Sequence, residues 1–257
     1  MNKSLKKFHV FLGSAFIFLI HLPFVFAKMK PYPAMPSSSP VITKNAALFN
    51  GSEIVSPVKK VSVYDSLKLQ TLGLSKMAYE TALKGFNALC EAGKIANDNI
   101  VSIVDFSLPS SQKRLFVIDL KNFKLLFNTY VAHGRNSGKE FADQFSNDPE
   151  SFKSSLGFYI TKDTYNGAHG FSLHLEGEEK GINDNAYSRS IVMHSAAYVD
   201  ENIVKSQGFI GRSLGCPALS PKIYKPIIEK IKNGSCLFLY SPNTNYLLHS
   251  RLLNQTS

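Results

Sequence analysis

Short runs of branched and aromatic residues recur along the chain from residue 99 to residue 240, and no other feature constrains the fold as strongly. Runs of this length and composition, separated by turn-forming residues, are typical of β-strands. They occupy residues 99–106, 113–120, 123–132, 157–161, 171–175, 190–195 and 235–240. Lys121-Asn122, between the second and third runs, predicts a tight hairpin. The sequence therefore predicts a mainly β domain.

A helical pattern precedes these runs. Within residues 63–94 the apolar residues recur at intervals of three and four, namely at Leu74, Met77, Ala78, Ala82, Phe86, Leu89 and Cys90. Ser75 suits the N-cap of this helix and Gly93 its end, and Gly73 separates a shorter helix over residues 65–72. The pattern predicts two helices joined at a glycine.

One more helix is predicted inside the β region, before the last strand-like run. Ser220-Pro221 precedes isoleucines at positions 223, 227, 228 and 231, and Gly234 follows them. Pro226 has to lie in the first turns of this helix, because a proline further inside would kink it.

The first 27 residues are typical of a secretory signal peptide. A basic start precedes an apolar stretch over residues 10–26, and Ala27 completes a small-residue cleavage pattern. The alternative is an uncleaved membrane anchor, but His21 and Pro23 interrupt the stretch. We expect cleavage after Ala27, secretion across the inner membrane, and a location in the periplasm or cell envelope with no stable membrane span.

The rest of the chain divides by composition. Proline and serine without apolar periodicity predict a flexible linker over residues 28–62. The helical segment covers residues 63–97, the main domain residues 98–241, and a polar tail residues 242–257. Because 44% of the residues are hydrophobic, the chain can build one sizeable core, and we expect a monomer.

The formal net charge of +10 bears on the partners of the protein. A basic exported protein favours anionic neighbours such as cell-wall polymers or acidic lipid surfaces. Nucleic acid is the wrong partner for this compartment, and the chain has no cluster of Lys and Arg interleaved with aromatic residues. The charge therefore points towards the cell wall.

The chain has three cysteines, Cys90, Cys216 and Cys236. An odd number in an oxidising compartment leaves at least one free thiol or an intermolecular bond. Cys90 lies on the apolar stripe of a helix and Cys236 begins a strand-like run, so both are interpreted as core thiols, with a disulfide between them as the alternative. For Cys216 a core thiol, half of a disulfide, a metal ligand and a nucleophile all stay open.

The stretch GRSLGCPALS, residues 211–220, is compatible with a nucleophile, but one cysteine and one histidine at this distance are weak evidence by themselves, because most such pairs are structural. A catalytic cysteine needs a base, a group that orients the base, and donors for the developing oxyanion. The run SIVMHS supplies His194 as the base, and Ser195 or its backbone carbonyl as the group that orients it. Gly215 gives the backbone freedom to expose the thiol, and its N–H and that of Cys216 are the natural oxyanion donors.

Further polar residues are candidates for substrate binding. Arg212 and Ser213 precede the Gly-Cys pair, and the arginine adds positive charge that favours a thiolate and an anionic substrate. His133 and Arg135 belong to a glycine-rich loop, which is either a solvated turn or a wall of the substrate cleft. Arg189 either meets a substrate carboxylate or forms a surface ion pair.

The remaining histidines do not suggest a metal site. His169 and His174 are five residues apart, so on one strand they would point to opposite faces and could not share a metal ion. Each is interpreted as a structural or cleft-lining residue. No cysteine pair has zinc-binding spacing. We therefore expect neither a metal nor an organic cofactor.

Several stretches together resemble the murein branch of the L,D-transpeptidase (YkuD-like) catalytic domain family. They are IVDFSLPSSQKRLFVIDL (103–120), VAHGRNSG (131–138), SSLGFYIT (154–161), HGFSLHLEGEEKGINDNA (169–186), VMHS (192–195) and QGFIGRSLGCPAL (207–219). The resemblance implies the YkuD-like β-sandwich with one inserted helix, preceded by a small helical segment. One departure is Leu214, because the commoner motif of the family has a second histidine there.

The resemblance also implies a reaction. The Cys216 thiolate would attack a peptidoglycan stem peptide with His194 as base, form a thioester, and pass the acyl group to an amine acceptor. Carbapenem-type β-lactams would acylate the same thiol. Three alternatives stay open: an L,D-carboxypeptidase that uses water as acceptor, a catalytically inactive wall-binding protein, and a zinc amidase, for which we find no ligand set.

Overall fold

A computed structural model describes residues 62–255. The predicted signal peptide and all but the last residue of the predicted linker lie outside these residues. The described part contains the strands β1 (Ile100–Asp105), β2 (Leu115–Asp119), β3 (Lys124–Thr129), β4 (Gly157–Gly167), β5 (Gly170–Gly177), β6 (Val192–Ser195), β7 (Ala218–Leu219) and β8 (Cys236–Tyr240). Its helices are α1 (Val63–Ser66), η1 (Leu69–Leu72), α2 (Lys76–Glu91), η2 (Arg135–Ser137), α3 (Glu201–Gln207), α4 (Tyr224–Ile231), α5 (Thr244–His249) and α6 (Arg251–Asn254).

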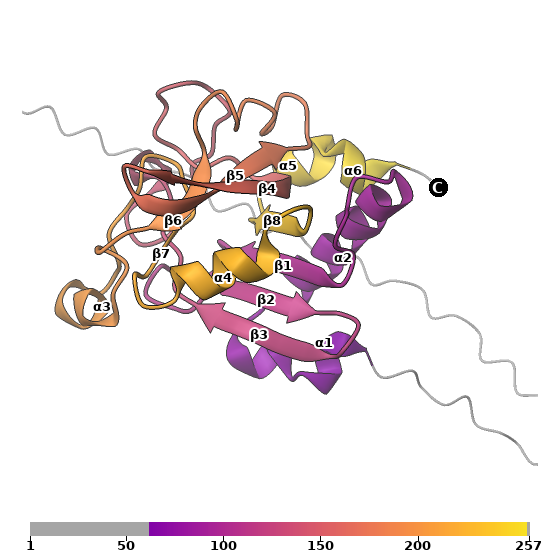
Figure 1. The fold of residues 1–257 in the computed structure, drawn as a ribbon, viewed down its shortest axis with the longest axis horizontal. Coiled ribbons are helices and arrows are strands. Elements are labelled where there is room, and N and C mark those ends of the chain that lie inside the picture. The colour runs from indigo at the N-terminus through magenta and orange to yellow at the C-terminus, as the bar shows by residue number, and fades with distance from the viewer. Residues whose placement is uncertain (1–61, 256–257) are drawn as a thin grey trace, which may run out of the picture. The chain divides into compact units, whose positions relative to one another are not determined.

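All eight strands form one mixed sheet in the order β3-β2-β1-β8-β4-β5-β6-β7. β8 pairs in parallel with β1, β7 pairs in parallel with β6, and the other neighbours are antiparallel. In Figure 1 the sheet curls, so that β1–β3 and β4–β6 lie on opposite sides of β8. The prediction of a mainly β fold is confirmed, and the two layers of the expected sandwich are parts of one continuous sheet.

The core lies around β1, β2 and β8, whose residues are all buried. Such strands carry branched and aromatic residues at successive positions because both faces of the sheet are covered. α2 packs against β1 and β8, and α4 packs against β5 and β6. Gly85 of α2 has no side chain because a Cβ there would lie 2.1 Å from the Phe158 ring. The helical segment is therefore part of the same core.

The predicted helices hold, with one change. Ser75 caps α2 by accepting a hydrogen bond from the Ala78 N–H at 3.0 Å. Pro226 lies in the first turn of α4, as expected. The shorter helix predicted over residues 65–72 is instead α1 and η1, separated at Lys68, whose φ of 50° does not fit a helix.

The predicted hairpin is present, but its turn is longer than two residues. β2 ends at Asp119, whose carboxylate accepts hydrogen bonds from the backbone N–H of Asn122 at 2.8 Å and from its side chain at 2.9 Å. Phe123 has a φ of 51° and leads into β3. An aspartate that caps the turn from within the strand end produces this four-residue connection.

The segment expected to be a polar tail packs against the domain. Tyr246 of α5 and Leu253 of α6 are buried in the core. The buried carboxylate of Glu179 accepts hydrogen bonds from the Tyr246 hydroxyl at 3.0 Å and from the Ser250 hydroxyl. The helices form because Asn243 and Ser250 cap them, and a polar composition alone did not reveal this.

Two features of the fold place the site. β6 and β7 run in parallel with His194 opposite Ala218, so the end of β6 lies beside the turn that precedes β7. The connection between them contains α3, which the sequence did not predict.

Within residues 62–255 the helices are all too short or too polar to span a bilayer.

Candidate active site

A pocket of about 430 Å³ opens beside the end of β6. Five of the site residues predicted from the sequence line this pocket, together with residues of the β4–β5 hairpin. Its lining is Tyr165, Ala168, His169, Arg189, Ser190, Ile191, Val192, His194, Tyr198, Arg212, Ser213, Leu214 and Cys216. The structure therefore brings Cys216, His194, Arg189, Arg212 and Ser213 together, although they come from separate segments of the chain.

Cys216 lies in a turn that hydrogen bonds hold in shape. The Ser213 hydroxyl donates to the Cys216 carbonyl at 2.7 Å and accepts from the Gly215 N–H at 3.1 Å. Gly215 has a φ of 124°, and a Cβ there would lie 2.9 Å from the Lys153 carbonyl oxygen. Only glycine fits this position without strain.

This turn corrects two predictions from the sequence. The Gly215 N–H already donates to Ser213, so it is not free to bind an oxyanion, and Gly215 shapes the turn instead. Ser213 likewise uses its hydroxyl within the turn. Apart from its own sulfur, the Cys216 N–H has no acceptor in residues 62–255, and it remains the available donor.

The Cys216 thiol is half-buried between β6 and the segment before it. Its Sγ accepts a hydrogen bond from the Val192 N–H at 3.5 Å, and the S–H donates to the Ser190 carbonyl at 3.6 Å. Burial raises the pKa of the thiol, while the Val192 N–H and the positive charge of Arg189 oppose that rise. The resting thiol is thus protonated and turned towards Ser190.

His194 is nearly buried, with 4% of its surface exposed. Its Nδ1 donates to the Ser195 carbonyl at 2.9 Å, and a carbonyl can only accept, so the neutral ring carries its proton on Nδ1. Burial lowers the pKa of His194, and the nearby His169 lowers it further. Nε2 is therefore an unprotonated acceptor, and the backbone carbonyl of Ser195, not its hydroxyl, orients the ring.

His169, which the sequence left as either a structural or a cleft-lining residue, lines the pocket. It lies in the turn between β4 and β5, and its ring stacks on His194 with centroids 4.4 Å apart and an angle of 25°. The alternation argument does not apply to this histidine, because His169 precedes β5. The signal was the glycine at 170, whose φ of 74° marks the turn. A second imidazole thus reaches the pocket from a different segment than Leu214.

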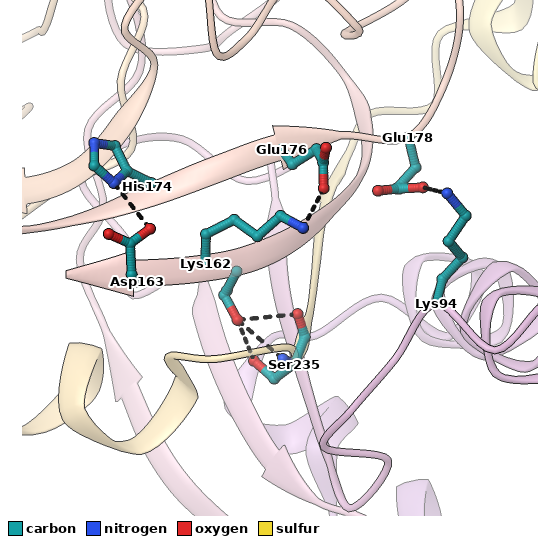
Figure 2. A network of polar contacts seen from close by, with 8 residues as sticks. Lys94, Lys162, Asp163, His174, Glu176, Glu178 and Ser235 are labelled. Atoms are coloured by element: carbon teal, nitrogen blue, oxygen red, sulfur yellow. Dashed lines mark hydrogen bonds and ion pairs between the residues drawn. The ribbon is translucent and has the colours of Figure 1, made fainter.

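His174 lies away from this pair. Its Nδ1 is 3.3 Å from an Asp163 carboxylate oxygen, and its ring stacks on Tyr165 at 4.4 Å. Figure 2 shows this contact on β4 and β5, beside the ion pair of Lys162 with Glu176. The charges on this surface are paired with one another.

His133 contradicts both sequence interpretations, because it is neither a solvated turn residue nor a cleft wall. It is fully buried. Arg114 donates to its Nδ1 at 2.6 Å, and its Nε2 donates to the Gly138 carbonyl at 3.2 Å. Burial, and then the charge of Arg114, lower the pKa of His133 to about 3. The two glycines near His133 suggested a loop in the sequence. The sequence did not reveal that His133 is buried as the hydrogen-bond acceptor of Arg114, because Arg114 is distant in the chain.

The three candidate arginines have different environments. Arg212 is exposed at the pocket, and its Nη1 donates to the Gly138 carbonyl at 3.2 Å. Arg135 lies outside the pocket lining, with its guanidinium 4.3 Å from the centre of the Phe152 ring. Only Arg212 is therefore both within the pocket and exposed to an incoming ligand.

Arg189 is tied into the loop over residues 146–155. Nη1 donates to the Ser146 carbonyl at 2.9 Å and to the Ser155 hydroxyl, and Nη2 donates to the Ser151 hydroxyl at 3.1 Å and the Lys153 carbonyl at 2.8 Å. These partners are neutral, so the predicted surface ion pair is wrong. A two-point clamp on a substrate carboxylate would need N–H groups that the loop already holds.

The remaining groups give no support to other chemistry. Cys90 and Cys236 are free thiols, half-buried and buried respectively, and burial raises the pKa of both. Across residues 62–255, no three His, Cys, Asp or Glu side chains gather as a metal site would require. The pocket therefore offers a thiol, a neutral imidazole with a free Nε2, and two guanidinium groups, a set suited to nucleophilic attack on a carbonyl.

Comparison with known proteins gives one family. The model of the L,D-transpeptidase catalytic domain (YkuD_2) matches residues 70–240. No curated protein matches the chain.

Several solved structures are similar at low identity. An L,D-transpeptidase from Mycobacterium smegmatis is 13% identical over 56% of this chain and 59% of its own, with a TM-score of 0.35. L,D-transpeptidase 3 from Mycobacterium tuberculosis is 12% identical over 56% and 61%, with a TM-score of 0.36. An L,D-transpeptidase from Stackebrandtia nassauensis is 14% identical over 71% and 79%, with a TM-score of 0.34. The match spans about three fifths of the two mycobacterial chains.

Proposed function

We propose that this chain, which belongs to the L,D-transpeptidase catalytic domain family, is a cysteine-dependent L,D-transpeptidase acting on peptidoglycan stem peptides. The observation that carries the proposal is that one pocket is lined by Cys216 and by His194, whose Nδ1–H is held by Ser195. A nucleophile and an unprotonated imidazole nitrogen in one pocket are the minimum that thioester chemistry requires.

The first step is acylation of Cys216. The thiol turns from the Ser190 carbonyl towards His194, and Nε2 takes its proton as Sγ attacks the amide carbonyl carbon of the stem. The tetrahedral intermediate collapses when the C–N bond breaks, and the imidazolium of His194 gives the proton to the leaving amine. The product is a thioester on Cys216. The rotation is required because the resting S–H points to Ser190 at 3.6 Å.

The negative charge of the intermediate needs a donor, and the Cys216 N–H is our candidate. The fixed turn supports this choice, since Ser213 holds the carbonyl of Cys216 while the N–H of Cys216 has no acceptor in residues 62–255 other than its own sulfur. Arg212 is the candidate for binding a carboxylate of the stem peptide, because it is the exposed cation of the pocket.

In the second step an amine of a neighbouring stem attacks the thioester. His194 Nε2 takes the proton of the amine, and the thiolate of Cys216 leaves and recovers a proton from the imidazolium. The result is a cross-link between two stems, and neither step requires a metal or an organic cofactor. The predicted signal peptide supports secretion across the inner membrane, so we propose that the activity belongs to the periplasm or cell envelope. We also propose that the active form is a monomer.

The test is mass spectrometry of muropeptides after sacculi are incubated with the mature domain. New dimers linked stem to stem are the expected result, and the Cys216→Ala protein is the matched control. Shortened stems without dimers would replace the transpeptidase with an L,D-carboxypeptidase. Unchanged sacculi, together with no thioester on Cys216 after carbapenem treatment of folded protein, would overturn the enzyme and leave a wall-binding role.

A further inference from the structure

Arg189 lies between the turn carrying Cys216 and the loop over residues 146–155, which also contact each other directly where the Ser154 hydroxyl donates to the Gly215 carbonyl at 3.0 Å. Its two terminal nitrogens make four hydrogen bonds to oxygens of that loop. Its Nη2 also lies 3.6 Å from the position that a Cβ of Gly215 would occupy. The guanidinium therefore stands directly beside the residue before the nucleophile.

No acidic side chain of residues 62–255 forms an ion pair with this guanidinium, although the Asp148 carboxylate in the same loop is close enough to favour its charged form. All four of its partners are carbonyl or hydroxyl oxygens, and the ion pairs found within residues 62–255 involve other cations. The pairs drawn in Figure 2, such as Lys94 with Glu178, show the contrast, because there each cation faces a carboxylate. A cation held by neutral dipoles keeps its full charge for a neighbouring anion.

The neighbouring group that such a positive charge would stabilise is the Cys216 sulfur in its anionic form. Burial disfavours its thiolate, and His194 is neutral before proton transfer, so the imidazole supplies no positive charge to the resting thiol. Three groups favour the anion: the Val192 N–H, which donates to Sγ at 3.5 Å, Arg189, and the backbone N–H of Cys216 itself. Of these, only Arg189 carries a full charge.

We propose that Arg189 is a positioning residue that fixes the 146–155 loop against the turn of Cys216 and, through the same four bonds, holds a permanent positive charge beside the sulfur. The proposal rests on the proposed function only in taking Cys216 as the reacting thiol. It assigns to Arg189 a role on the nucleophile, in place of the substrate carboxylate contact that the sequence suggested.

The test is the pH dependence of alkylation of Cys216 by iodoacetamide, read from the mass of its peptide. Sγ displaces iodide, forms one S–C bond and loses its proton to solvent, so the rate reports the thiolate. In Arg189→Met the pH at which Cys216 alkylation reaches half its maximal rate should rise by about one unit, and alkylation at neutral pH should become about tenfold slower. Cys90 in the same protein is the internal reference, and its rate should not change.

Two further variants separate charge from architecture. Arg189→Lys keeps the positive charge but loses the forked guanidinium group. The pH midpoint of Cys216 alkylation in this variant should therefore stay within about a third of a pH unit of the wild-type value, which is well below the shift caused by loss of a neighbouring charge. It should lower turnover on sacculi, and hydrogen exchange in residues 146–155 should become faster. Arg135→Met removes an exposed cation outside the pocket and should leave the midpoint unchanged.

The other titratable groups that line the pocket are kept in every variant, namely Tyr165, His169, His194, Tyr198 and Arg212. An unchanged midpoint in folded Arg189→Met would overturn the proposal. If that variant does not fold, a rise of about one unit in Arg189→Lys would overturn it instead. Alkylation needs no peptidoglycan, so the two proposals can fail independently. If sacculi stay unchanged but the alkylation midpoint shifts in Arg189→Met, the transpeptidase proposal is contradicted and the proposed role of Arg189 is retained.

Discussion

The pocket and the buried interior of this domain each contain a cysteine, a histidine and an arginine. The pocket set is Cys216, His194 and Arg189, and the interior set is Cys236, His133 and Arg114. Burial moves the pKa in the same direction in both sets, upward for the thiols and downward for the imidazoles. A perturbed pKa therefore does not distinguish the site from the core here.

The difference lies in what each group has left to offer. Both ring nitrogens of His133 are occupied, one by Arg114 and one by the Gly138 carbonyl. His194 uses only Nδ1, and within residues 62–255 its Nε2 has no partner. A buried polar group that satisfies all its hydrogen bonds stabilises the fold, whereas one with a free position facing a cavity is available for chemistry.

The largest expected effect separates the cysteines. Cys216→Ala should abolish turnover on sacculi while changing the free energy of unfolding by less than about 0.5 kcal/mol, because the thiol lies at the surface of the pocket. Cys236→Ala should keep turnover and lose about 1–3 kcal/mol of stability, because it leaves space in the core. Muropeptide analysis and urea unfolding measure the two quantities. A strongly destabilised Cys216→Ala protein would make that thiol structural.

The histidines should separate next. His194→Ala should slow acylation of Cys216 by a carbapenem about 10²–10⁴-fold, the usual contribution of a general base. The readout is the growth of the adduct mass on the Cys216 peptide with time. His249→Ala, which changes an exposed histidine outside the pocket, is the control and should react at the wild-type rate. Equal rates in the two variants would remove His194 from the mechanism.

His133 should show its role in the pH dependence of stability. Its pKa is about 3 in the folded protein and about 6.5 when unfolded, so below pH 6.5 the unfolded state binds a proton that the folded state does not. The free energy of unfolding should therefore fall by about 1.4 kcal/mol for each pH unit below 6.5, until about pH 3. His133→Gln should remove this term, so its urea midpoint should fall less between pH 7 and pH 5. Parallel curves for the two proteins would contradict the assignment.

The smallest expected effect concerns His169, which contacts His194 by stacking and not by a hydrogen bond. Its ring covers one face of His194, and such a pair contributes about 0.5–1.5 kcal/mol, so His169→Ala should slow acylation about two- to tenfold. His169→Phe keeps the stacked ring and should restore most of the rate. A phenylalanine variant as slow as the alanine variant would show that the imidazole itself is needed.

Local patterns in the sequence were sufficient for much of this protein. Changes of apolar period located most strands and α2, and Ser75 predicted a cap. The stretches around His194 and Cys216 indicated the family, and the two residues line one pocket. These inferences work because strand and helix periodicity, capping and a glycine before a cysteine depend on neighbours in the chain. The position of Pro226 in α4 followed from the same kind of local rule.

Tertiary structure alone decided which polar groups are free. The sequence could not show that Arg114 occupies His133, that Ser213 takes the Gly215 N–H, or that the 146–155 loop holds Arg189. These partners are distant in the chain or are backbone atoms, and backbone atoms carry no signature in a sequence. Hydrogen-bond capacity is fixed by residue type, but its use depends on which groups the folded chain brings within about 3 Å.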